Sequence, residues 1–131
     1  MRVSLARVLI GLVILGNLQC ALLFLIEPGA YAPGFQLAGE VGDAVMRGFG
    51  VLFLMWNIPY MVALWNPIRH RLSLFEAVAM QSVGLVGETL IYINAPVTLL
   101  VMRRSLERFI LFDFLGLLAL LVAVWLVRRT G

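Results

Sequence analysis

Four long runs of apolar residues occupy most of the chain, and short polar segments separate them. The runs cover residues 8–26, 44–65, 72–93 and 109–127. A helix needs about 20 mostly apolar residues to cross the roughly 30 Å hydrocarbon core of a bilayer, and each run has about that length. The pattern therefore predicts an all-α protein: a single domain, residues 1–131, built as an integral membrane bundle of four transmembrane helices.

The composition favours a membrane protein over a small water-soluble domain. Hydrophobic residues make up 63% of the 131 positions and charged residues only 13%. So short a chain cannot hide that much apolar surface in its own core. The formal net charge is +3, and all ten basic residues are arginines, mainly at the ends of the apolar runs. Such arginines extend to the membrane surface, so we do not expect nucleic-acid binding.

The arginines also predict an orientation. If the N-terminus and the C-terminus are both cytoplasmic, six arginines lie inside and four outside, in line with the positive-inside rule. The inner six are Arg2, Arg7, Arg69, Arg71, Arg128 and Arg129, and the outer four are Arg47, Arg103, Arg104 and Arg108. We therefore expect a multi-pass protein of the cell inner (plasma) membrane.

The connecting segments carry signals of their own. Residues 27–43 contain two prolines and four glycines, which favours an ordered or re-entrant outer loop. Residues 95–108 mix apolar residues with three arginines and predict an amphipathic segment on the outer membrane surface. Ser73 and Glu76 have the spacing of a capping box, which predicts a helix start at Ser73.

Three carboxamides fall at one depth of the predicted bundle. Asn17, Asn57 and Gln81 lie on three different helices, each about 12–15 Å from the inner boundary at a rise of about 1.5 Å per residue. An unpaired amide in lipid is costly, so these side chains should point inward. They form a candidate midplane polar layer. One interpretation is that they hold the helices together; the other is that they form the polar floor of a ligand or water cavity.

A second candidate layer is charged. Arg47, Glu88 and Asp113 lie on the second, third and fourth helices, about 27, 24 and 21 Å from their inner ends. Charges at such depth normally pair or line a wet cavity, and the planar guanidinium of Arg47 suits a bridge between two carboxylates. Arg104 or Arg108 is then expected to compensate the remaining acid. This charged cluster is the first candidate functional site, and a purely architectural salt bridge is the alternative.

The sequence offers few residues for cofactor or metal chemistry. It has one histidine, His70, and one cysteine, Cys20, whereas haem, iron–sulfur and zinc sites need several such ligands. No Ser/His/Asp set or phosphate-binding glycine loop occurs. We therefore expect no metal, no cofactor and no catalytic residue. Cys20 is expected to be a small buried apolar side chain.

Two glycine-spaced motifs resemble a known family. Arg47-Gly48-Phe49-Gly50 opens the second helix, and Gly84-Leu85-Val86-Gly87-Glu88 lies in the third. Together they make residues 44–92 similar to the DoxX-like small bacterial four-helix membrane proteins. The resemblance implies the four-helix topology, a bacterial inner membrane, and a group whose members are mostly uncharacterised or linked to redox complexes as small subunits.

These observations lead to three functional hypotheses. The first is a small non-catalytic accessory or scaffold subunit of a larger bacterial membrane complex, with lipid and other membrane subunits, or copies of itself, as partners. The second is a membrane-embedded binding or transport module for a small apolar ligand, such as a lipid, a quinone-like or a carotenoid-like molecule. The third is an intramembrane enzyme that uses Glu88 or Asp113 as a general acid or base.

Overall fold

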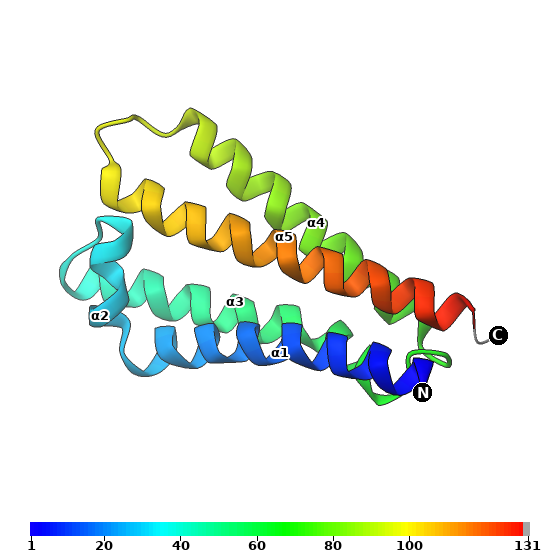
Figure 1. Cartoon of the computed structure of the whole chain (residues 1–131). Coiled ribbons are helices and arrows are strands. Elements are labelled where there is room, and N and C mark those ends of the chain that lie inside the picture. The colour runs from blue at the N-terminus through cyan, green and yellow to red at the C-terminus, as the bar shows by residue number, and fades with distance from the viewer. Residues whose placement is uncertain (130–131) are drawn as a thin grey trace.

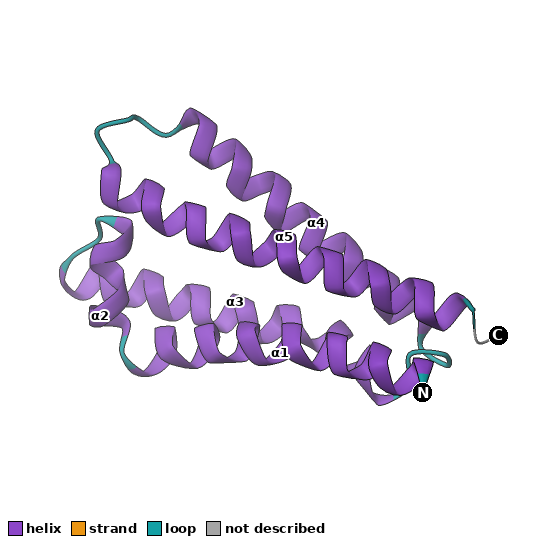
Figure 2. Cartoon of the chain, in the orientation of Figure 1, coloured by secondary structure: helices purple, strands orange, loops and turns teal. Residues whose placement is uncertain are grey.

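The computed structural model describes residues 1–129, and within that range it contains helices and no strands. Four helices are long: α1 (Arg2–Ile26), α3 (Gly39–Trp65), α4 (Arg71–Asn94) and α5 (Leu100–Arg128). Between α1 and α3 lie the short helix α2 (Pro28–Tyr31) and the 3-10 helix η1 (Ala32–Phe35) (Figure 2). All four long helices are long and apolar enough to cross a membrane.

The long helices form an antiparallel bundle in which each helix contacts two neighbours. α1 and α4 each pack against both α3 and α5, so α1 and α4 occupy opposite corners. The N-terminus and the 66–70 turn lie at one end, together with the C-terminal end of α5 (Figure 1). We call this the terminal end. The opposite end, the capped end, carries α2, η1 and the 95–99 connection, and α4 diverges from α1 and α3 towards it (Figure 1).

Each predicted apolar run lies within one helix, but the helices extend further than the runs. α3 begins at Gly39 rather than at residue 44, and α5 begins at Leu100 rather than at residue 109. Most of the predicted surface segment 95–108 therefore forms the first turns of α5, and that prediction is wrong. Arg103 supports this start, because its Nη1 donates to the carbonyl oxygens of Tyr92 (2.8 Å) and Ala95 (2.9 Å) at the end of α4.

The predicted capping box at Ser73 and Glu76 is also wrong. α4 begins at Arg71, and no side-chain hydrogen bond caps its first turn. The chain turns instead at Asn66, whose Oδ1 accepts hydrogen bonds from the backbone N–H groups of Ile68 (3.2 Å) and Arg69 (3.0 Å). This Asx-type turn sets the direction in which α4 leaves.

The 27–43 connection is ordered and helical. Pro28 stands in the first turn of α2, where its missing N–H leaves no hydrogen bond unmade. Ala32 is buried at the start of η1, and Gln36 turns the chain with a left-handed φ of 57°. α2 contacts α1 and α3, and η1 contacts α3 and α5, so this segment covers the capped end.

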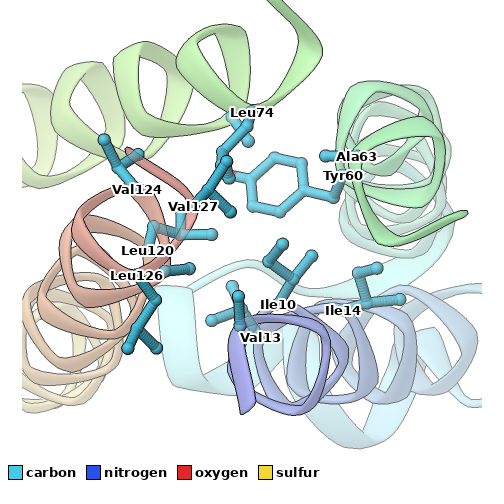
Figure 3. Packing of buried hydrophobic residues seen from close by; sticks show 13 residues of the cluster. Ile10, Val13, Ile14, Tyr60, Ala63, Leu74, Leu120, Val124, Leu126 and Val127 are labelled. Carbon is cyan, nitrogen blue, oxygen red and sulfur yellow. The ribbon is translucent and has the colours of Figure 1, made fainter. Parts of the chain in front are cut away.

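The apolar core fills the terminal half of the bundle. Tyr60 extends from α3 across the centre towards Leu74, Leu120 and Val127, while Ile10 rises from α1 (Figure 3). All five side chains are at most 2% exposed. Buried branched aliphatic side chains from α1, α4 and α5 therefore interdigitate around the Tyr60 ring of α3, as close-packed interiors require.

Candidate functional site

Two of the predicted amides bind each other at mid-bundle. Asn17 of α1 donates from Nδ2 to Oδ1 of Asn57 on α3 over 3.4 Å, and Asn57 donates to the carbonyl oxygen of Phe53 over 2.7 Å. Asn17 is 4% exposed and Asn57 is fully buried. Both therefore face the interior, as expected, and they join α1 to α3.

Gln81 of α4 connects α3 with α5. Its Oε1 accepts a hydrogen bond from the Tyr60 hydroxyl (2.7 Å), and its Nε2 donates to Oδ1 of Asp113 (2.9 Å). The hydrogen-bonded chain Tyr60–Gln81–Asp113 thus links α3, α4 and α5. Sequence reasoning missed Tyr60, although its distance of three residues from Asn57 was a usable signal, because residues three apart share a helix face.

A small polar cavity connects these groups with Glu88. Its volume is about 50 Å³, and its lining residues are Asn17, Phe53, Trp56, Gln81, Gly84, Glu88 and Asp113. Within the described residues, Oε2 of Glu88 is buried without a hydrogen-bond partner. Gly84 makes room for the carboxyl group of Asp113, since a Cβ at this position would collide with Oδ2.

The two predicted polar layers are one cluster, and Asp113 belongs with the amides. Asp113 lies 13 residues after the start and 15 before the end of α5, which runs over Leu100–Arg128. Gln81 lies 10 residues after the start and 13 before the end of α4. Both are therefore central in their helices. The predicted distance of Asp113 from the inner end of its helix, about 21 Å, agrees with its place 15 residues before the end of α5. The separation into two layers was wrong, because Asp113 accepts a hydrogen bond from Gln81.

Arg47 does not join the cluster. It is exposed, and it forms no ion pair or hydrogen bond with any residue between 1 and 129. The predicted bridge from Arg47 to Glu88 and Asp113 is therefore absent, and neither Arg104 nor Arg108 replaces it. Met46 and Gly50 lie on the buried side of α3, and a step of one residue turns the side chain by about 100°, which directs Arg47 outward.

A larger cavity occupies the capped half, between α1, α2, η1, α3 and α5. Its volume is about 410 Å³, and six aromatic rings line it: Phe24, Tyr31, Phe35, Phe53, Phe109 and Phe112. We call it the aromatic pocket. Phe24 is at its centre, with ring centroids 5.5 Å from Tyr31, 6.1 Å from Phe53 and 6.3 Å from Phe109. These spacings are typical of aromatic pairs in contact.

Both ends of the aromatic pocket are polar. At the inner end Asn17 and Phe53 also line the small polar cavity, so the two spaces share a wall. At the outer end, Ser105 donates from Oγ to the carbonyl oxygen of Gly34 (2.6 Å), and Arg108 donates from Nη2 to Oγ of Ser105 (3.2 Å). The pocket thus runs from a buried amide to an arginine.

Two small residues of α1, Gly16 and Cys20, line the aromatic pocket. A Cβ at Gly16 would lie 2.5 Å from a ring carbon of Phe112. Cys20 also lines the pocket and is half-buried rather than fully buried as expected. The pocket itself was not predicted, because its rings come from five separate elements, α1, α2, η1, α3 and α5. The available signal was composition: the sequence contains eight phenylalanines, and five of them line this one space.

The arrangement suits binding better than catalysis. The Ser105 hydroxyl is engaged by a carbonyl oxygen and a guanidinium, and neither is a general base that could activate it. The two carboxyl groups lie in the small cavity, whereas the aromatic pocket has apolar walls and polar ends. Comparisons with family models, with curated proteins and with solved structures gave no match for this chain.

Proposed function

We propose that this chain is a multi-pass membrane protein whose aromatic pocket binds a small, largely apolar ligand. The observation that carries the proposal is the pocket itself: about 410 Å³, within the range of sites that take one small molecule. Aromatic walls suit the body of an apolar ligand, and Asn17 and Ser105 offer polar contacts at its ends. This is the binding or transport module inferred as the second hypothesis from the sequence.

The outer surface supports insertion into a membrane. Large hydrophobic side chains cover the outside of all four long helices, among them Leu12, Leu52, Val83 and Leu118. Water would disfavour so much exposed apolar surface, whereas lipid tails accommodate it. The six arginines predicted to be cytoplasmic lie near the N-terminus, the C-terminal end of α5 or the 66–70 turn, all of which are at the terminal end. We therefore propose that this end faces the cytoplasm.

A specific observation also favours the accessory-subunit hypothesis as a second candidate. Ala44 and Gly48 are both exposed on α3, and a Cβ at Gly48 would meet no atom within 4 Å. Small residues four apart on an exposed face allow another membrane helix to approach closely. Association with another subunit or with a second copy, and the relationship to DoxX-like proteins, remain predictions.

Native mass spectrometry of the protein extracted gently from its own membrane tests the proposal. We expect a reproducible added mass of a few hundred daltons on the wild-type chain. Cys20→Phe places a ring inside the aromatic pocket, and this variant should lose the added mass. Leu22→Phe is the matched control: it adds a ring two residues away on α1, where the side chain is 49% exposed, and should keep the added mass.

The same experiment separates the candidate functions. Bare wild-type protein, or an added mass that Cys20→Phe retains, would contradict ligand binding in the aromatic pocket. Stoichiometric additional chains would support the subunit hypothesis instead, and Gly48→Leu should then release them.

A further inference from the structure

The mouth of the aromatic pocket opens beside a groove that carries positive charge. This outer groove has a volume of about 570 Å³ and is lined by Val101, Arg104, Ser105, Glu107, Arg108 and Leu111. Ser105 and Arg108 line both spaces. A molecule that fills the pocket therefore reaches the groove at these two residues.

The two arginines of the groove are not neutralised by the protein. Arg104 and Arg108 form no ion pair with any residue between 1 and 129. Within that range Arg108 uses one of its five N–H donors, in the hydrogen bond to Ser105. The nearest acid in sequence, Glu107, accepts a hydrogen bond from the Tyr92 hydroxyl (2.7 Å) and is held towards α4.

Arg103, the residue before Arg104, has a structural role, because its guanidinium is held by contacts within the protein. It donates to two carbonyl oxygens at the end of α4, and its guanidinium lies 4.0 Å from the centre of the Tyr92 ring. Arg104 and Arg108 lack such contacts. Their guanidinium groups are therefore available to a ligand at the pocket mouth.

We infer that the ligand is an anionic single-chain amphiphile, a membrane lipid with one carboxylate or phosphate head group. This inference rests on the proposed function and deepens it. The apolar chain lies among the rings of the aromatic pocket, and the head group accepts charge-assisted hydrogen bonds from Arg108, with Arg104 adding a second positive charge. Guanidinium groups suit such planar, paired recognition of carboxylate and phosphate oxygens.

Matched probes test the head-group charge in nanodiscs of neutral phosphatidylcholine. Dodecanoate, dodecyl phosphate and dodecanol share one chain length and differ in the head group, and inorganic phosphate supplies the head group alone. Cys20 is the single cysteine of the chain and lines the pocket, so its reaction rate with N-ethylmaleimide reports occupancy. We expect both anionic amphiphiles to slow the reaction at concentrations about tenfold below those of dodecanol, and phosphate alone to have no effect.

Charge variants show where the preference originates. Arg108→Gln should abolish the roughly tenfold preference for the anions while dodecanol still protects Cys20. Arg108→Lys should retain most of the preference, and Arg104→Gln should reduce it less than Arg108→Gln does. Arg47→Gln removes the same charge from an exposed site outside both cavities and should leave the preference unchanged.

The outcomes separate this inference from the proposed function. Equal protection by dodecanol and dodecanoate would overturn the anionic head group and leave the aromatic pocket as a ligand site. Protection by inorganic phosphate alone would also overturn the inference, because the site would then recognise the free anion. If no amphiphile protects Cys20, the proposed function fails as well.

Discussion

The two halves of the bundle are built from the same long helices, but one half is closely packed and the other encloses a cavity. In the terminal half, side chains such as Ile10, Leu74 and Leu120 are at most 2% exposed and interdigitate around Tyr60. In the capped half, rings of similar apolar character surround a cavity of about 410 Å³. The polar cluster of Asn17, Gln81 and Asp113 lies between the halves.

The difference follows from side-chain shape and helix divergence. Branched aliphatic side chains fill the space where four helices converge, and close packing there stabilises the fold. Towards the capped end α4 diverges (Figure 1), and the phenylalanine rings there line a cavity rather than filling it. We therefore expect the terminal half to supply most of the stability, whereas the capped half contains a preformed cavity.

The largest effect is expected when the terminal core loses volume. Leu120 is fully buried, and Leu120→Ala should lower the free energy of unfolding by about 3 kcal/mol through lost burial and a residual cavity. Leu121→Ala is the matched control, because Leu121 is the next residue of α5 and is 46% exposed. Thermal unfolding in detergent would measure both. Similar costs for the two variants would contradict the close packing of this half.

An intermediate effect is expected when the same large side chain is added to each half. Ala77→Phe inserts a ring at a fully buried position of the terminal core, and overpacking should cost about 2 kcal/mol. Cys20→Phe inserts the same ring into the aromatic pocket and should change the free energy of unfolding by less than about 1 kcal/mol. A larger loss of stability in Cys20→Phe than in Ala77→Phe would contradict the difference in packing between the two halves.

The smallest effect is expected at the polar cluster between the halves. Gly84→Ala places a methyl group against Oδ2 of Asp113 and should cost about 1 kcal/mol by shifting Asp113 away from Gln81. Gly87→Ala adds the same methyl group to α4 where no atom lies within 4 Å. It should be neutral or stabilise the helix by up to about 1 kcal/mol. Equal effects of the two variants would mean that Asp113 is free to move.

The sequence predicts the elements of this fold well. Each apolar run of about 20 residues lies within one helix, and Asn17, Asn57 and Gln81 face inward because an amide is costly to expose to an apolar exterior. Helix ends were predicted less well. Arg103 and Asn66 fix two of them through hydrogen bonds to backbone groups of α4 and of the 66–70 turn, and such contacts leave no periodic signal.

The candidate site was predictable only in part, for a geometric reason. Whether Arg47 points inward depends on the rotation of α3 about its axis, and a difference of one residue decides it. The aromatic pocket depends on where α1, α2, η1, α3 and α5 converge. The eight phenylalanines indicate an aromatic-rich interior, but neither their number nor the apolar pattern says where the rings meet. The predicted charged cluster is therefore absent: Arg47 points outward, and the carboxyl groups lie with the amides inside the bundle.

An experimental structure of the protein purified from its own membrane, with its native lipids retained, is the most direct test of ligand binding in the capped half. We expect continuous non-protein density in the aromatic pocket, running from Asn17 past Phe24 and Phe109 to Arg108. A pocket closed by inward rotation of those rings, with no space left for a ligand, would contradict the proposed function.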